Sequence, residues 1–252
     1  MKKSFSLFLA LSSLFMLTAC GGQTQDNSSS VDPVQPPAAS QPQQSTSTSQ
    51  PSDISSPVQD SESSPDSSNI LIAYFTYGEN APLPDGIDAS ASASIQLRGD
   101  SSLTGNTGLV ADMIAEATGG DLFSILTAEQ YPDNYDDTID VGRDEKGAGA
   151  RPELSSHLDS LDGYHTVFLG FPNWWGDMPM AIYSFLDEYD LSGKTIVPFV
   201  TSGGSGFSGA IQAIENAEPN AAVLEGLSLR DSRSSQAEDD VADWLARLGL
   251  AG

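Results

Sequence analysis

The stretch Val167–Pro179, VFLGFPNWWGDMP, decides the fold of this chain. The residues Thr166–Gly170 are apolar, partly β-branched and bounded by glycine, which is typical of a short buried strand. Two adjacent indoles follow, and a helical pattern begins at Met178. Because ligands of open α/β sheets bind beyond the carboxyl ends of the strands, we interpret Trp174 and Trp175 as a wall for a planar ligand. The alternative is that the two indoles only close the end of the core.

Apolar segments alternate with helical patterns on both sides of this stretch. Continuous apolar strands separated by helices predict an α/β fold with a parallel sheet covered on both faces. Five such strands indicate a doubly wound five-stranded parallel sheet in the order 2-1-3-4-5. The predicted strands are Ile70–Thr76, Leu122–Thr127, Thr166–Gly170, Thr195–Thr201 and a broken strand over Ala222–Leu229. The predicted helices are Gly108–Thr118, Asp136–Lys146, Met178–Tyr189, Gly209–Ala217 and Ser235–Leu248.

Three predicted loops meet at the carboxyl edge of this sheet. The first offers hydroxyls and the free amides of a helix start, which bind an anion without a basic residue. The second offers indole faces for stacking on a ring, and the third offers glycine backbone that a ligand can approach closely. Together they predict a site for flavin mononucleotide (FMN). The loop residues are Thr76 with Thr104, Gly105, Asn106 and Thr107; Pro172, Asn173, Trp174, Trp175 and Gly176; and Thr201, Ser202, Gly203, Gly204, Ser205 and Gly206.

Residues 69–252 resemble the flavodoxin-like family of small bacterial flavoproteins. The resemblance rests on the pieces YFT…TGNT, FLGFPNWWGDMP and SGKTIVPFVTSGGSG. It implies that Thr76, Gly105, Asn106 and Thr107 hold the FMN phosphate. It also implies that the segments 172–176 and 202–206 line the isoalloxazine ring.

One departure from the family pattern is an insertion, Tyr77–Leu103, within the phosphate turn. That turn is usually continuous after the first strand. The insertion could cover the site, which would disfavour a freely docking electron carrier. Whether Gly78-Glu79-Asn80 faces the flavin stays open at this point.

The amino terminus resembles a bacterial lipoprotein signal. Lys2 and Lys3 precede an apolar run, Phe5–Leu17, which is too short for a permanent span and is followed by Leu-Thr-Ala-Cys ending at Cys20. We expect residues 1–19 to be a signal peptide and Cys20, the only cysteine, to carry lipid. The alternative is a signal peptide with an incidental cysteine. Two lysines are not a twin-arginine signal, so we expect export of an unfolded chain.

Residues 20–68 are expected to form a disordered tether behind the lipidated cysteine. The segment 21–68 holds 15 Ser, 8 Gln and 7 Pro, with no aromatic residue and no Leu. Such a composition has no apolar surface to bury against the entropy of ordering. The sequence therefore predicts one folded domain, residues 69–252, attached extracytoplasmically to a membrane of the cell envelope.

The charge of residues 69–252 is strongly acidic. This segment contains 29 Asp and Glu and 8 Lys and Arg, which gives a formal net charge of −21. This argues against nucleic acid and anionic lipid surfaces as partners. It favours redox partners with a basic surface, although solubility alone would also explain it.

Other site types are less well supported. Asp133, Asp136, Asp137 and Asp140 lack the glycine and terminal glutamate of a known calcium loop, and an acidic helix start explains them. His157 and His165 are the only histidines, which excludes a His-rich metal site. A hydrolase centred on Ser205 lacks the second glycine of the G-x-S-x-G elbow. We therefore expect no metal.

Three function classes remain open. The first is a protein that binds FMN and transfers electrons between redox partners. The second is an FMN-dependent NAD(P)H oxidoreductase acting on a quinone or another small acceptor. The third is a binding module without flavin. Since soluble NAD(P)H is a cytoplasmic reductant, an extracytoplasmic domain favours electron transfer, in which the flavin carries the chemistry and no catalytic side chain is needed.

Overall fold

The computed structural model describes residues 69–83 and 94–251. The predicted signal peptide, Cys20, the predicted tether and residues 84–93 of the insertion lie outside the described residues. In the described part of the chain, no helix has the length and apolar character needed to cross a membrane.

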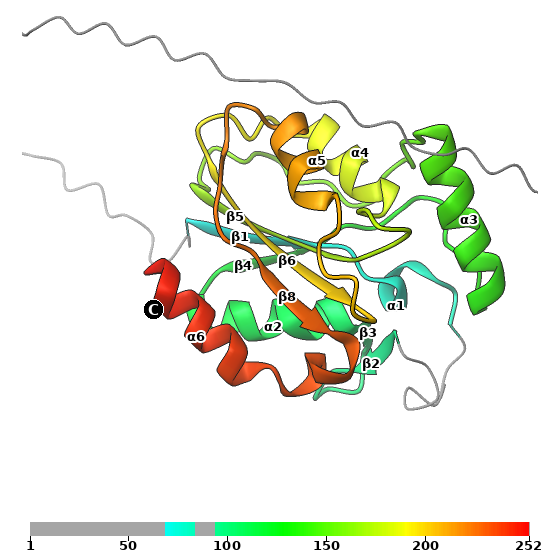
Figure 1. Ribbon diagram of the computed structural model, residues 1–252, viewed down its shortest axis with the longest axis horizontal. Coiled ribbons are helices and arrows are strands. Elements are labelled where there is room, and N and C mark those ends of the chain that lie inside the picture. Colours follow the sequence, from blue (N-terminus) through cyan, green and yellow to red (C-terminus); the bar gives the residue numbers. More distant parts are fainter. Residues whose placement is uncertain (1–68, 84–93, 252) are drawn as a thin grey trace, which may run out of the picture. The chain divides into compact units, whose positions relative to one another are not determined.

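A parallel sheet forms the centre of the domain (Figure 1). Its strand order is β4-β1-β5-β6-β7, and β8 also pairs with β6. This order confirms the predicted 2-1-3-4-5 arrangement, with the broken fifth strand present as β7 and β8. The strands are β1 (Ile70–Tyr74), β4 (Asp121–Ser124), β5 (Thr166–Pro172), β6 (Thr195–Ser202), β7 (Ala222–Val223) and β8 (Leu227–Arg230).

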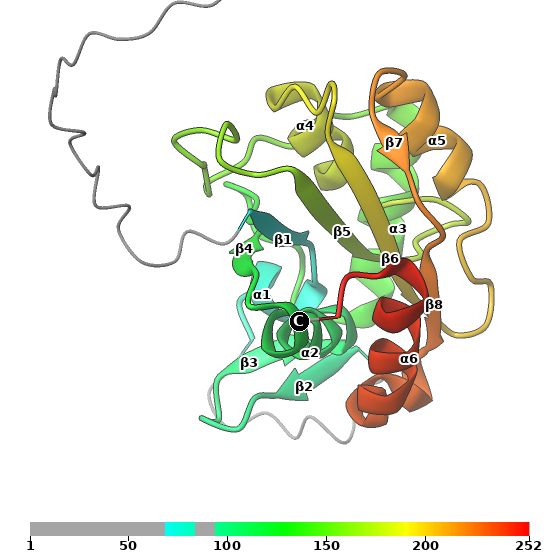
Figure 2. The same ribbon diagram turned by 90° about the vertical axis from the view of Figure 1, so that its left-hand side faces the viewer.

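Helices cover both faces of this sheet, as Figures 1 and 2 show from two directions. Side chains of β1 alternate between the faces, as strand geometry requires. Ile72 and Tyr74 pack on the side of α2 (Asn106–Thr118) and α6 (Glu238–Leu248). Leu71, Ala73 and Phe75 pack on the other side, where α4 (Met180–Glu188) and α5 (Ala210–Ala217) lie. The helix α3 (Tyr135–Ala148) packs against α4.

Two predicted boundaries differ from the structure by three residues, and the others agree to within two. The second strand was expected to reach Thr127, but β4 ends at Ser124, and the Thr127 amide donates to the Asn80 side chain at 2.8 Å. A side chain therefore replaces the strand partner at this point. The closing helix was expected from Ser235, but a 3-10 helix, η2 (Asp231–Gln236), comes first and α6 starts at Glu238.

The described ends of the insertion are ordered into secondary structure. A short helix, α1 (Tyr77–Asn80), follows β1 directly. The strands β2 (Ile95–Leu97) and β3 (Leu103–Gly105) form an antiparallel hairpin, with Ile95 opposite Gly105. The hairpin leads into α2, so the insertion lies beside the start of the first long helix.

A polar network centred on Arg98 attaches this hairpin to the domain. The Arg98 guanidinium contacts Glu79 Oε1 at 2.9 Å and Asp112 Oδ2 at 2.7 Å, and it donates to the Tyr74 hydroxyl at 2.9 Å. Glu79 also accepts hydrogen bonds from Thr104 and Ser124. Burial, together with the Glu79 charge, raises the pKa of Tyr74 to about 12. The network thus joins β1, α1, the hairpin, α2 and β4.

Candidate functional site

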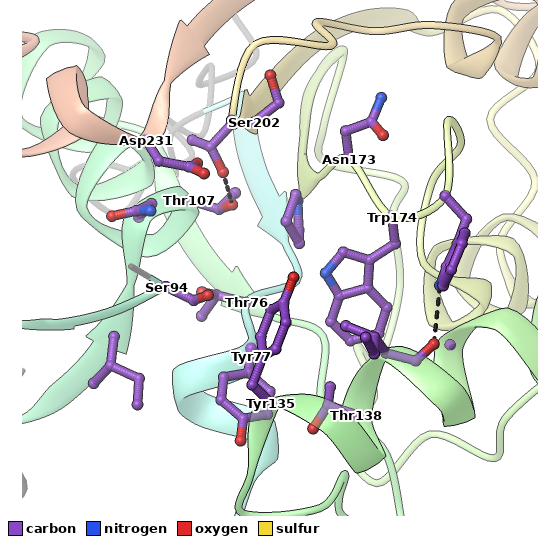
Figure 3. A pocket seen from close by; sticks show the side chains of 18 of the residues that line it. Thr76, Tyr77, Ser94, Thr107, Tyr135, Thr138, Asn173, Trp174, Ser202 and Asp231 are labelled. Atoms are coloured by element: carbon purple, nitrogen blue, oxygen red, sulfur yellow. Dashed lines mark hydrogen bonds between the residues drawn. The ribbon is translucent and has the colours of Figure 1, made fainter. Parts of the chain in front are cut away.

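A cavity of about 610 Å³ opens at the carboxyl ends of β1, β5 and β6. Its size lies within the range of small-molecule sites. Figure 3 shows Thr107, Ser202 and Asp231 at one end and Trp174 toward the other. The lining combines the three predicted loops with residues of the insertion, of α3 and of the segment after β8.

Ten of the predicted site residues line this cavity. They come from all three loops: Thr76, Asn106, Thr107, Pro172, Asn173, Trp174, Trp175, Thr201, Ser202 and Gly203. The structure therefore brings the three loops together, as the strand order predicted. Six of the predicted loop residues are not in the lining: Thr104, Gly105, Gly176, Gly204, Ser205 and Gly206.

Thr104 and Gly105 contact residues next to the cavity and do not line it themselves. The Thr104 hydroxyl donates to Glu79 Oε1 at 2.6 Å and so belongs to the Arg98 network. A Cβ on Gly105 would stand 2.0 Å from Thr76 Oγ1 and 2.8 Å from the Ser94 carbonyl oxygen. Only glycine therefore lets the Thr76 hydroxyl and the hairpin both approach the start of α2.

Hydrogen-bond donors gather at the end of the cavity where α2 begins. The hydroxyls of Thr107 and Thr201 are 2.8 Å apart, which joins α2 to the end of β6. The Asn106 amide donates to the Ser94 carbonyl at 3.2 Å, so the hairpin takes one donor of this turn. The following amides of the first helical turn have no intrahelical partner. This end of the cavity is thus suited to an anion or to ligand hydroxyls.

Trp174 forms part of the core and of the cavity wall at once. Its ring meets those of Phe75 and Tyr131 edge-to-face, with centroids 5.4 Å and 5.2 Å away. A Cβ on Gly142 of α3 would stand 3.1 Å from the indole. The indole therefore closes the core and also presents surface to the cavity, and its contact with a planar ligand stays a prediction.

Trp175 is held differently from its neighbour. It is half exposed, and its φ of 55° lies in the left-handed region, which a bulky side chain rarely adopts. Its indole N–H donates to the Ile139 carbonyl at 2.9 Å, and its own carbonyl accepts from Lys146 Nζ at 2.7 Å. These bonds fix the loop against α3, so the second indole is turned to that helix although it also lines the cavity.

Asn173 ties the indole loop to the glycine-rich loop. Its side-chain N–H group donates to the Gly206 carbonyl at 2.7 Å, and its side-chain oxygen accepts from the Gly176 amide at 3.0 Å. Ser202 Oγ accepts from the amides of Gly204 and Gly206 at 3.2 Å and 3.0 Å. The glycines outside the lining thus shape the turn, and several hydrogen bonds hold the glycine-rich loop in place.

Nine lining residues were missed by the sequence analysis. Four of them lie at positions i, i+3, i+4 and i+7 of the otherwise acidic helix α3, an uncharged stripe that helical periodicity would have revealed. Asp231 directly follows the broken fifth strand, and no sequence pattern indicates where the chain runs after that strand. Gly78, Glu79 and Asn80 do not line the cavity, which answers the question left open for the insertion. The missed residues are Tyr77, Ser94, Ile95, Asp133, Tyr135, Thr138, Ile139, Gly142 and Asp231.

The charge of the lining is negative. It contains no Lys, Arg or His, and its ionisable carboxyls are Asp133 and Asp231. Asp133 is exposed, whereas Asp231 is partly buried, and burial raises its pKa against an opposing hydrogen bond from Asn106. A phosphate at this site would be held by neutral donors alone.

The other sequence candidates have structural roles. Asn134 caps α3, its side chain accepting from the Asp137 amide at 3.0 Å, and Asp140 pairs with Arg143. The acidic helix start predicted there is confirmed. Within residues 69–83 and 94–251, no cluster of three potential metal ligands occurs. His157 bonds Glu188 at 2.7 Å, and this hydrogen bond raises the pKa of His157.

Two solved structures of similar size share this fold. A Bacteroides uniformis protein, provisionally described as a flavoprotein, is 28% identical, with a TM-score of 0.53 over 70% of this chain and 97% of its own. Its counterpart from Bacteroides eggerthii is 26% identical, with a TM-score of 0.52 over 71% and 97%. A Lactobacillus acidophilus flavoprotein in complex with FMN is more distant, with 19% identity and a TM-score of 0.47 over 66% and 96%.

No curated protein matches the sequence. The family model described as Flavodoxin matches residues 97–248, from the end of β2, the first strand of the insertion hairpin, to the end of α6. This match spans more than half of the 252 residues and includes all three cavity loops apart from Thr76. By its sequence and its fold, the chain belongs to the flavodoxin family.

Proposed function

We propose that the domain binds one FMN in this cavity and transfers electrons between redox partners. A single observation carries the proposal: one cavity has an aromatic wall at one end and neutral hydrogen-bond donors at the start of a helix at the other. A mononucleotide with a planar ring and a phosphate needs both. Membership of the flavodoxin family supports FMN as that ligand.

The residues present fit such a ligand. The close approach of Thr76 to the start of α2 exists because Gly105 has no Cβ. The Thr76 hydroxyl and the α2 amides that follow Asn106 would donate to phosphate oxygens. The Thr107 hydroxyl, which pairs with Thr201, would lie beside them. Trp174 would then stand beside the ring, and Ser202 and Gly203 at its edge. The bound group would supply the electron-accepting ring system, and the protein would set its position and its potential.

Two properties of the surface around the cavity support electron transfer to other proteins. Tyr135, 72% exposed, and the half-exposed Trp175 both reach the rim. The formal net charge of −21 in residues 69–252 favours encounter with a partner that has a basic surface. We also propose that lipid on Cys20 attaches the domain to a membrane outside the cytoplasm, where soluble NAD(P)H is not the reductant.

The visible spectrum of the purified full chain tests the first step. We expect a yellow protein with one FMN per chain, or a colourless protein that takes up one added FMN and quenches its fluorescence. A colourless protein that does not bind added FMN would leave only a flavin-free binding module.

Electron transfer is tested on the FMN-loaded chain after chemical reduction. We expect oxidation by a basic haem protein at a rate that falls as salt is added, because screening weakens attraction between opposite charges. Turnover of a neutral quinone with NADH or NADPH, and no reaction with the haem protein, would instead favour the oxidoreductase.

A further inference from the structure

Asp231 has an unusual position for an acidic residue in a nucleotide site. It is the first residue of η2, directly after β8, and it lines the cavity with Thr107 and Ser202 (Figure 3). A hydrogen bond from the Asn106 side chain reaches it, so its carboxyl lies beside the first residue of α2. The proposed phosphate site is thus shared with a carboxyl group.

Two of the arginines on the surrounding elements are paired with other carboxylates. On the hairpin and α2, Arg98 contacts Glu79 and Asp112. The first turn of α2 has no acidic residue. On the elements next to Asp231, Arg233 pairs with Asp240. The Arg230 guanidinium lies beside the glycine-rich loop, within 4 Å of where a Gly204 Cβ would be, and Arg230 does not line the cavity. Across the cavity stand Asp133, Tyr77 and Tyr135.

An ionised Asp231 and an FMN phosphate would therefore repel one another without a cation in the lining between them. A phosphate monoester carries nearly two negative charges at neutral pH. Two like charges at one site raise the pKa of one of them. A protonated carboxyl, in contrast, has an O–H that donates to a phosphate oxygen. Protonation thus converts a repulsive neighbour into a hydrogen-bond donor.

We propose that Asp231 is a specificity-determining residue that accepts the phosphate of FMN only in its protonated form, so that FMN binding takes up one proton from solvent at this carboxyl. The inference rests on the proposed FMN site and adds to it a linkage between pH and the choice of flavin. Riboflavin, which has the same ring but no phosphate, is not subject to this linkage.

The sign of the linkage is fixed by which state holds the proton. The FMN complex holds one more proton than the free protein, so FMN affinity is highest below the pKa of the free carboxyl. Affinity falls as the pH rises above that pKa, by up to about tenfold per pH unit. The burial that already raises the pKa of Asp231 acts in the same direction.

The test measures dissociation constants of FMN and riboflavin between pH 5 and 9 for the full chain, for Asp231→Asn and for the control Asp133→Asn. Both variants remove one carboxyl of the lining, and Asp133 is the exposed one. We expect the ratio of FMN affinities, Asp231→Asn over wild type, to be smallest at pH 5 and to grow as the pH rises, reaching at least about tenfold at pH 9. Asp133→Asn should follow wild type.

The phosphate of FMN itself titrates near pH 6 in all three proteins, so the difference between wild type and Asp231→Asn isolates Asp231. Riboflavin affinity should be independent of pH and equal in the three proteins. Calorimetry in two buffers of different ionisation heat should show proton uptake with FMN in wild type and less in Asp231→Asn.

Three results would overturn the inference while leaving the FMN site intact. They are equal pH slopes in wild type and Asp231→Asn, an equal change at Asp133→Asn, and a loss of FMN and riboflavin affinity together in Asp231→Asn. The last would assign Asp231 to the ribityl hydroxyls. If wild type binds neither flavin, the proposed function itself fails.

Discussion

Replacing Arg98 with Met should detach the insertion hairpin from the domain. The substitution keeps an unbranched side chain but removes three interactions, with Glu79 Oε1, Asp112 Oδ2 and the Tyr74 hydroxyl, at 2.7–2.9 Å. Two carboxylates then lose their common cation. The cost depends on how far water can replace the guanidinium.

The structure sets that cost near the lower end of the range for buried ion pairs. The side chain of Glu79 is 13% exposed and that of Arg98 is 22% exposed, so water compensates little of the loss. Removing one partner of a buried pair typically costs about 3–5 kcal/mol. Glu79 keeps its hydrogen bonds from Thr104 and Ser124, which stabilise its charge. We therefore expect a loss of about 3 kcal/mol in the free energy of unfolding.

Urea unfolding of the full chain without flavin, followed by tryptophan fluorescence, measures this loss with the slope m as a check on two-state behaviour. Arg233→Met is the matched control, because it breaks the Arg233–Asp240 pair, whose side chains are 61% and 41% exposed. Exposed pairs contribute only about 0–1 kcal/mol. A released hairpin should also speed FMN dissociation, since Ser94 and Ile95 line the cavity.

The double variant Arg98→Met with Glu79→Gln separates charge from packing. It removes the unpaired carboxylate of Glu79, so it should recover part of the lost stability. If Arg98→Met costs no more than Arg233→Met, the network is screened by water and the reasoning is wrong. If the double variant is less stable than the single one by the full cost of Glu79→Gln alone, the two residues are not coupled.

Three further predictions concern the site and the anchor. Trp174→Ala should weaken FMN binding by about 1–3 kcal/mol and shift the flavin midpoint potential upward; unchanged affinity and potential in the folded fraction would make the indole a core residue only. Gly105→Ala should lower FMN affinity and cost about 1–3 kcal/mol of stability through the contact with Thr76, whereas Gly99→Ala, with nothing within 4 Å, should do neither. Cys20→Ser should release the domain from membranes in cell fractionation once its signal is removed; retention without lipid would contradict the lipoprotein interpretation.

The fold could be predicted because its signals are local. Continuous apolar runs such as Thr195–Thr201 are buried on both faces, and this leaves few alternatives to a parallel sheet. The strand order then followed from the number of strands and from the loops that had to meet. Boundaries were less accurate where a side chain, such as Asn80 at Thr127, replaced backbone pairing.

The site was predicted only where loops directly follow strands. Ser94 and Ile95 reach the cavity because a charged network far along the insertion holds the hairpin, and neither residue carries a pattern of its own. Tyr135 lies in a stretch that was considered only for its acidic residues. Asp231 is brought to α2 by the path of the chain after β8, a tertiary relation that spacing does not encode.

The contact between Gly142 and Trp174 has an evolutionary consequence. A glycine within α3 costs about 1 kcal/mol relative to alanine, and it is kept where a Cβ would stand 3.1 Å from the indole. In descendants of this chain, alanine at 142 requires the indole to shift by a few tenths of an ångström for as long as Trp174 is present. A smaller ring at position 174 removes that requirement, so substitutions at the two positions should be found together more often than chance predicts.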